Sequence, residues 1–155
     1  MQTFLPYLDL EDCDTTYDFY LGCAGNLDTK RLGNQRVETM QIMKALLTGT
    51  GGWVNHPATK MWQGYEWSLL SYQAAVCTEW VENCGFKDTC LPKTIDLYFH
   101  HVDYTGDLIY KDPPWLGDKD FHLAQQSNLL RKDPEYYGKR FPGVPDDLPY
   151  IWPVQ

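Results

Sequence analysis

The spacing of apolar residues predicts a mainly helical chain. Apolar side chains from Leu32 to Leu47 fall within one broad arc at 100° per residue, which predicts a helix over residues 28–47. Asn26 or Asp28 can cap the start of this helix, and the run of threonine and glycine at 48–52 ends it.

A second and longer helix is predicted over residues 56–83. Asn55 or His56 can cap it, Pro57 suits its first turn, and Gly85 can close it. Its large apolar residues recur at spacings of three, four and seven and include Met61, Trp62, Tyr65, Leu69, Tyr72, Val76, Trp80 and Val81. We expect this helix to be buried at the centre of the fold.

Two further helices are predicted in the second half of the chain. The first covers 92–101, and the second covers 118–132 with Asp118 as its cap. Asp133 and Pro134 then begin a new turn, as an N-cap followed by proline at the first helical position. The intervening residues 102–117 have the composition of a loop, in which 107–111 are the candidates for an extended stretch.

The C-terminal residues complete an all-α, compact single domain over 1–155. Residues 142–153 contain four prolines among aromatic side chains, which predicts an extended tail packed over the core. We divide the domain into an N-terminal segment at 1–26, a helical core at 27–132, and a turn with its tail at 133–155.

Charge is distributed unevenly. The 155 residues include 43% hydrophobic and 15% aromatic side chains, as expected of a globular protein, and the formal net charge is −8. Residues 1–26 contain five acidic residues and no lysine or arginine, so we interpret them as a solvated loop. Residues 27–56 are net basic. The pattern indicates an acidic body with one arginine-bearing groove, which is an unusual balance for a protein that scans duplex DNA.

The sequence gives no sign of a targeting segment or a membrane span. An odd number of cysteines, five, without a signal peptide favours reduced thiols and a cytoplasmic location, and no two of them form a CxxC pair. We expect no metal, no other cofactor and no membrane partner, and the oligomeric state is left open.

The most informative polar segment lies in the first predicted helix. Arg31, Gln35 and Glu38 are spaced to share one helix face, where they could bind a phosphate and a base or sugar edge, with Glu38 available for proton transfer. The alternative is an exposed Arg–Glu pair on a solvated face. Arg36 falls within the apolar arc, so it either forms a buried ion pair, faces a pocket that holds an anion, or extends its head to the surface.

Asn55 and His56 form a second candidate site at a helix start. A histidine there should have a lowered pKa and a neutral ring, and the free amides of the first turn can bind an anion. The alternative is that both residues only cap the helix.

A third candidate lies in the helix predicted at 118–132. His122 and Gln126 lie near one face, and we interpret this polar stripe as a water-filled groove in which both residues could bind a nucleotide. Arg131 and Lys132 at its end could bind phosphate, or they could only complement the helix dipole.

Several of these segments resemble a group of small uncharacterised bacterial and phage proteins, which is similar to the pyrimidine-dimer DNA glycosylase (phage endonuclease V) family. The matching segments are MQTFLP at 1–6, RLG at 31–33, QRVE at 35–38, NHP at 55–57, PWLG at 114–117, RKDP at 131–134 and DDLPY at 146–150.

The resemblance implies a compact helical fold and a chemistry that uses the N-terminal α-amine. In that family the amine attacks C1′ of deoxyribose to give a Schiff base, and a glutamate of the first helix assists. Carried over, the resemblance implies Met1 as nucleophile and Glu38 as the acid–base group, and we expect Gln2 beside Met1 to bind the nucleotide. Arg31 and Arg36 would match arginines that bind phosphate.

Two other functions are consistent with the same residues. One is a non-catalytic binder, or a hydrolase, of a small nucleotide or nucleotide-like signal, as a phage or bacterial accessory protein. The acidic exterior favours this alternative, because a small ligand needs only a local basic pocket. The other is a partner-binding protein whose aromatic tail is the interface.

Overall fold

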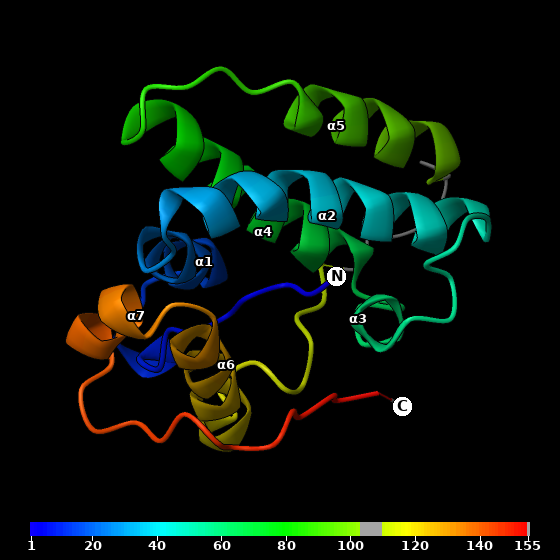
Figure 1. Cartoon of the computed structure of the whole chain (residues 1–155). Helices are drawn as coiled ribbons and strands as arrows, with labels where there is room; N and C mark the ends of the chain where they lie inside the picture. Colours follow the sequence, from blue (N-terminus) through cyan, green and yellow to red (C-terminus); the bar gives the residue numbers. More distant parts are fainter. Residues whose placement is uncertain (103–109, 155) are drawn as a thin grey trace.

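Two long helices, α2 (Thr29–Thr48) and α4 (Glu66–Glu82), pack on each other at the centre of the molecule. The computed structural model describes residues 1–102 and 110–154, in which every regular element is helical. Helix α1 (Thr16–Gly25) packs on α4, and α5 (Cys90–His101) packs on α2 and also contacts α4 (Figure 1). The all-α fold class is thereby confirmed.

Three further helices lie below α2, α4 and α5 in the view of Figure 1, and a short 3₁₀ turn precedes α1. They are the 3₁₀ turn η1 (Leu10–Asp12), α3 (Pro57–Lys60), α6 (Lys119–Lys132) and α7 (Pro134–Arg140). Helices α6 and α7 pack on each other. Within the described parts of the chain, no helix combines the length and the apolar character that crossing a bilayer requires.

The helices predicted at 28–47 and 118–132 are confirmed, together with their caps. The Asp28 carboxylate accepts hydrogen bonds from the first turn of α2, and Gly49 ends that helix in a left-handed conformation with φ of 62°. The Asp118 carboxylate caps α6 in the same way. In these helices the signals at the termini agree with the apolar periodicity. The extended stretch considered at 107–111 lies mostly outside the described residues.

The single long helix predicted over 56–83 is wrong, because the chain breaks between α3 and α4. Gly64 has a φ of 83°, which a helix cannot accommodate, and its N–H donates to the Glu66 side chain at 2.9 Å. The turn directs Trp62 into the core, where its indole N–H donates to the Thr3 hydroxyl at 3.0 Å. Apolar spacing alone did not detect the break, because both sides of the turn are buried.

The interpretation of 1–26 as a solvated loop is also wrong. Thr15 and Asp18 form a reciprocal capping box that begins α1, and Phe19 and Tyr20 of that helix are fully buried. Residues 2–5 are buried as well. The acidic residues of this segment are exposed, and one of them, Asp18, caps α1. The net charge was therefore a poor guide, because the apolar residues of the same segment are buried in the core.

The buried N-terminal segment runs in extended form beside α6, whose polar side chains bind its backbone. The His122 ring accepts the Gly117 N–H at Nε2 (3.0 Å), so Nδ1 carries the proton and donates to the Leu5 carbonyl at 2.8 Å. The Gln126 amide donates to the Pro6 carbonyl at 2.6 Å. The polar stripe of α6 is therefore no open groove, and these two side chains serve the fold.

Over the described residues 141–154, the tail after α7 contains no helix and is fixed to α6. The Arg131 guanidinium donates to the carbonyls of Asp146 (2.7 Å) and Leu148 (2.9 Å). This confirms the extended tail, and it assigns Arg131 to holding the tail in place.

Burial keeps the pKa of His122 below its usual value of 6.5. In the unfolded chain the ring binds a proton below about pH 6.5, whereas the folded protein resists it, so the free energy of unfolding should fall as the pH drops from about 8 to about 5. Urea unfolding measures this. His122→Gln should be less stable at the upper pH, and its deficit relative to the unmodified protein should shrink toward the lower pH. If the stability deficit of His122→Gln stayed the same at every pH, the ring would not be neutral and held by two hydrogen bonds in the folded protein.

Candidate active site

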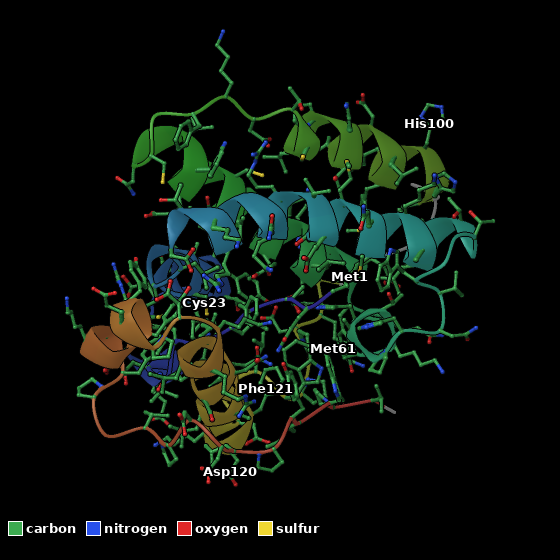
Figure 2. All side chains as sticks on the ribbon, viewed as in Figure 1. Met1, Cys23, Met61, His100, Asp120 and Phe121 are labelled. Atoms are coloured by element: carbon green, nitrogen blue, oxygen red, sulfur yellow. The ribbon has the colours of Figure 1, made fainter. Side chains whose placement is uncertain are left out.

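The N-terminus of the chain lies in a surface pocket of about 380 Å³. The extended segment brings Met1 to the space between α2 and α3 (Figures 1 and 2). The pocket draws its lining from the N-terminal segment, α2, the end of α6 and the tail, namely Met1, Gln2, Phe4, Glu38, Lys132, Tyr150 and Trp152.

Helix α2 fixes the backbone at the N-terminus through two side chains on one face. The Glu38 carboxylate accepts the Gln2 backbone N–H at 2.9 Å. One turn earlier, the Gln35 amide donates to the Gln2 carbonyl and accepts the Phe4 N–H, both at 2.9 Å. Residues 35 and 38, one turn apart on α2, thus bond successive backbone groups of the extended N-terminal segment. The Glu38 carboxylate therefore lies next to the first peptide bond of the chain.

The Gln2 side chain is a structural anchor. It is 7% exposed, donates to the side-chain Oε1 of Gln125 at 2.9 Å, and accepts from the side-chain amide of Asn128 at 2.6 Å. The sequence did not single out Gln125 and Asn128 as site residues, nor Phe4, Tyr150 and Trp152 of the pocket lining. The polar run QQSN at 125–128, beside the apolar pair at 129–130, was the available signal. Its contact with residue 2 could not be predicted, because the two segments are distant in sequence.

His56 lies near the N-terminal amine and Glu38. Its Nδ1 accepts the Ala58 N–H at 3.1 Å and so caps α3, which leaves Nε2 to carry the proton of a neutral ring. Burial lowers the pKa of His56, the positive charge of the Met1 amine lowers it further, and Glu38 opposes both. The neighbouring Asn55 is exposed and does not line the pocket.

A second hollow of about 290 Å³ adjoins the first along the start of α2. The two share Phe4, Glu38 and Lys132, and the second adds Lys30, Arg31, Asn34 and Gln35. Arg31 is held by Asp28 at 3.1 Å and Asp133 at 3.6 Å, and it also donates to the Lys132 carbonyl at 3.1 Å. Lys30, Arg31 and Lys132 thus give the groove a basic wall beside Glu38.

Arg36 does not join this groove. Its guanidinium bonds to Asp88 at 2.7 Å and stacks 4.6 Å from the centre of the Trp80 ring. Of the three interpretations considered, the buried ion pair is the one observed, and Arg36 joins α2 to the start of α5. His122, Gln126 and Arg131 likewise bond to the protein's own backbone.

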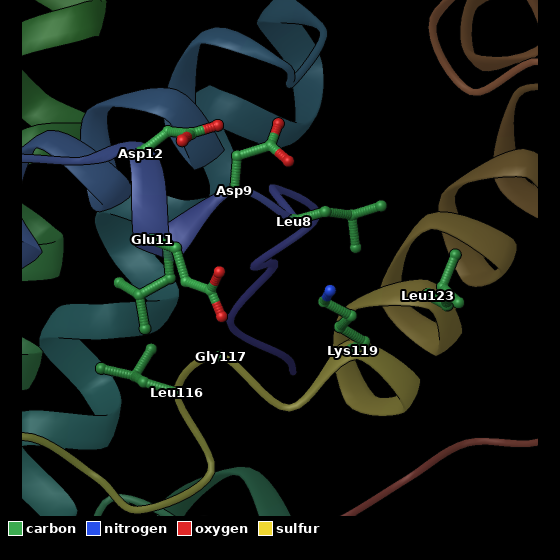
Figure 3. Close-up of a pocket in the computed structure, with 9 residues that line it drawn as sticks. Leu8, Asp9, Glu11, Asp12, Leu116, Gly117, Lys119 and Leu123 are labelled. Carbon is green, nitrogen blue, oxygen red and sulfur yellow. The ribbon is translucent and has the colours of Figure 1, made fainter.

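A larger pocket of about 490 Å³ lies between η1 and the start of α6 (Figure 3). Asp9, Glu11 and Asp12 line it with Lys119, so its charge disfavours a phosphate. None of the residues that the sequence predicts to bind or react lines this pocket. Among residues 1–102 and 110–154 there is no group of three or more His, Cys, Asp and Glu side chains placed to hold a metal ion.

Residues 1–93 match the family model described as pyrimidine dimer DNA glycosylase. The match covers more than half of the chain, and the protein therefore belongs to this family. No curated protein and no solved structure matched the chain. Met1, Glu38 and His56 lie inside the matched region, whereas Lys132 and the tail lie outside it.

The anchoring of the N-terminus by Gln35 can be tested by mutation. Gln35→Ala leaves the buried Phe4 N–H, the Gln2 carbonyl and the Tyr72 hydroxyl without this partner. Since each buried group left unsatisfied costs about 1–3 kcal/mol, we expect the free energy of unfolding to fall by roughly 3 kcal/mol.

Gln41→Ala is the matched control, because Gln41 lies on the same helix and is exposed. Its effect on urea unfolding should stay within about 0.5 kcal/mol. Equal effects of the two variants would show that Gln35 does not hold the segment.

Proposed function

We propose that the protein cleaves the N-glycosidic bond of a damaged pyrimidine nucleotide in DNA, with the Met1 α-amine as nucleophile and Glu38 as the acid–base group. The observation that carries this proposal is the Glu38 carboxylate, held 2.9 Å from the Gln2 nitrogen in the pocket that contains Met1. The family supports a glycosylase-like function.

The arrangement suits a displacement at C1′ of the sugar. The amine nitrogen forms a bond to C1′ while the bond from C1′ to the base breaks, and the electron pair leaves with the base, which takes up a proton. The carboxylate stabilises the positive charge that develops on the sugar. Glu38 then moves a proton from the attacking nitrogen toward the ring oxygen, and the sugar opens to a Schiff base.

The basic wall of the groove supports a phosphate-bearing substrate. Lys30, Arg31 and Lys132 line the hollow beside Glu38, and the ion pairs to Asp28 and Asp133 orient the Arg31 guanidinium. The net charge of −8 weakens general attraction to DNA, so binding depends on these local contacts.

Borohydride trapping on duplex DNA with an abasic site tests the chemistry. The unmodified protein should form a covalent adduct, because borohydride reduces the Schiff base to a stable amine. Glu38→Gln should slow adduct formation by at least roughly 100-fold, the usual contribution of general acid–base catalysis.

Glu82→Gln, at an exposed position at the end of α4, should trap as the unmodified protein does. Absence of any adduct, or equal trapping by Glu38→Gln, would rule out this mechanism. A rise in melting temperature with free nucleotides, without an adduct, would instead support the small-nucleotide alternative.

Lys132 should contact a backbone phosphate. Each phosphate contact adds about 0.9 to the slope of log affinity against log salt, so Lys132→Ala should reduce that slope by about this amount. Fluorescence anisotropy over a salt series measures it. Lys93→Ala, at an exposed position of α5, should leave the slope unchanged. An unchanged slope in Lys132→Ala would remove the phosphate contact from the proposal.

A further inference from the structure

The pocket of about 490 Å³ between η1 and the start of α6 has an apolar lining. Leu8 and Leu123 lie on its two sides and are half-buried, yet neither packs into the hydrophobic core of the described residues (Figure 3). Leu10 and Leu116 complete the apolar lining and do pack against the core. Leucine surface that faces an open pocket gains free energy when a partner covers it.

Three carboxylates stand beside this apolar lining. Asp9, Glu11 and Asp12 are exposed, and none of them takes part in an ion pair within the part of the chain that the structure describes. Lys119 is the basic residue of the lining. The pocket therefore has a net negative charge, and its carboxylates are available to cations of another molecule.

The fold holds the two walls of this pocket together. The buried His122 ring accepts the Gly117 N–H at 3.0 Å and donates to the Leu5 carbonyl at 2.8 Å, so it joins the loop before α6 to the N-terminal segment. Gly117 has a φ of 84°, and a Cβ added there would lie 2.9 Å from Cδ2 of Leu10. The pocket is thus formed before any partner binds, which lowers the entropic cost of binding.

We propose that this pocket is a docking site for a segment of another protein in which apolar side chains are interspersed with lysine or arginine. The apolar side chains of such a segment cover Leu8 and Leu123, and its cations pair with Asp9, Glu11 and Asp12. An apolar centre with a polar rim is the usual composition of a protein interface. A metal ion or another small cation would satisfy the carboxylates but leave the leucines in water.

This docking site is separate from the reaction proposed at the N-terminus. The pocket shares no lining residue with the pocket that contains Met1. Its negative charge opposes a DNA phosphate, so its ligand belongs to a different chemical class from the substrate of the Met1 pocket. The docking site and the proposed function can therefore fail independently of each other.

Fluorescence anisotropy with three labelled peptides of equal length tests the apolar and the charged contacts separately. The first peptide repeats Lys-Leu-Gly, the second has glutamine in place of lysine, and the third has serine in place of leucine. The unmodified protein should bind the first roughly tenfold more tightly than either of the others, because each of these lacks one of the two contributions.

Charge variants locate the binding of the Lys-Leu-Gly peptide. The double variant Asp9→Asn with Glu11→Gln should weaken it by roughly fivefold, as expected for the loss of two exposed ion pairs. The matched control is Glu82→Gln with Asp96→Asn, which removes the same charges at exposed positions of α4 and α5 and should leave the affinity unchanged.

An apolar variant tests the lining. Leu123→Asn should weaken the Lys-Leu-Gly peptide by roughly tenfold, because a polar side chain replaces an apolar contact at the centre of the interface. Val81→Asn, at a 44% exposed side chain of α4, is the control and should not change the affinity. If the melting temperature shows that Leu123→Asn fails to fold, Leu8→Asn replaces it, because Leu8 also lies outside the core.

Equal affinity for the leucine and serine peptides would overturn the docking site, since the pocket would then attract any cation. Displacement of the Lys-Leu-Gly peptide by an equal concentration of spermine would overturn it as well, in favour of a site for small polyamines. Absence of saturable binding, or equal weakening by the pocket variants and their controls, would show that this pocket does not bind such a segment.

Discussion

The buried, extended segment at the N-terminus is the constraint on which the rest of the structure depends. Such a segment cannot satisfy its own backbone groups, so every carbonyl and N–H that leaves water needs a partner from elsewhere. Helix α2 supplies Gln35 and Glu38 on one side, and α6 supplies His122 and Gln126 on the other. The hydrogen bonds that stabilise the fold are thereby the ones that place Met1 beside Glu38.

This arrangement also explains how an acidic protein can hold a basic groove. Much of the negative charge lies near η1 and the start of α1. Asp9, Glu11 and Asp12 of this region line a different pocket from the one that contains Met1. At the groove, Asp28 and Asp133 are used to orient Arg31, and Lys132 is left to face the pocket. Since electrostatic interactions weaken within about 10 Å at moderate salt, the local balance decides what binds.

The sequence allowed the prediction of features that depend on local signals. Helices α2 and α6 have a capping aspartate and clear periodicity, and both were predicted within a residue or two. The resemblance led to Met1 and Glu38, and the pocket contains both. The break at Gly64 was missed because the residues on both sides of the turn are buried, so that the apolar pattern continues across it.

The misassigned site residues share one physical cause, which is contact between residues distant in sequence. The partner of Arg36 is Asp88, and the partner of Gln126 is the Pro6 carbonyl. Neither pairing can be read from helical spacing, which reports which face of a helix a residue occupies but not what covers that face. The aromatic tail was predicted to be extended, yet its position at the Met1 pocket depends on Asn128 of α6.

The most direct test of the central claim is to locate the sugar after borohydride reduction on abasic DNA. Protease digestion and mass spectrometry identify the modified residue. The structure predicts attachment to the α-nitrogen of Met1, in the peptide that contains the chain's first residues. Attachment to the side chain of Lys132, the lysine that lines the same pocket, would contradict the account.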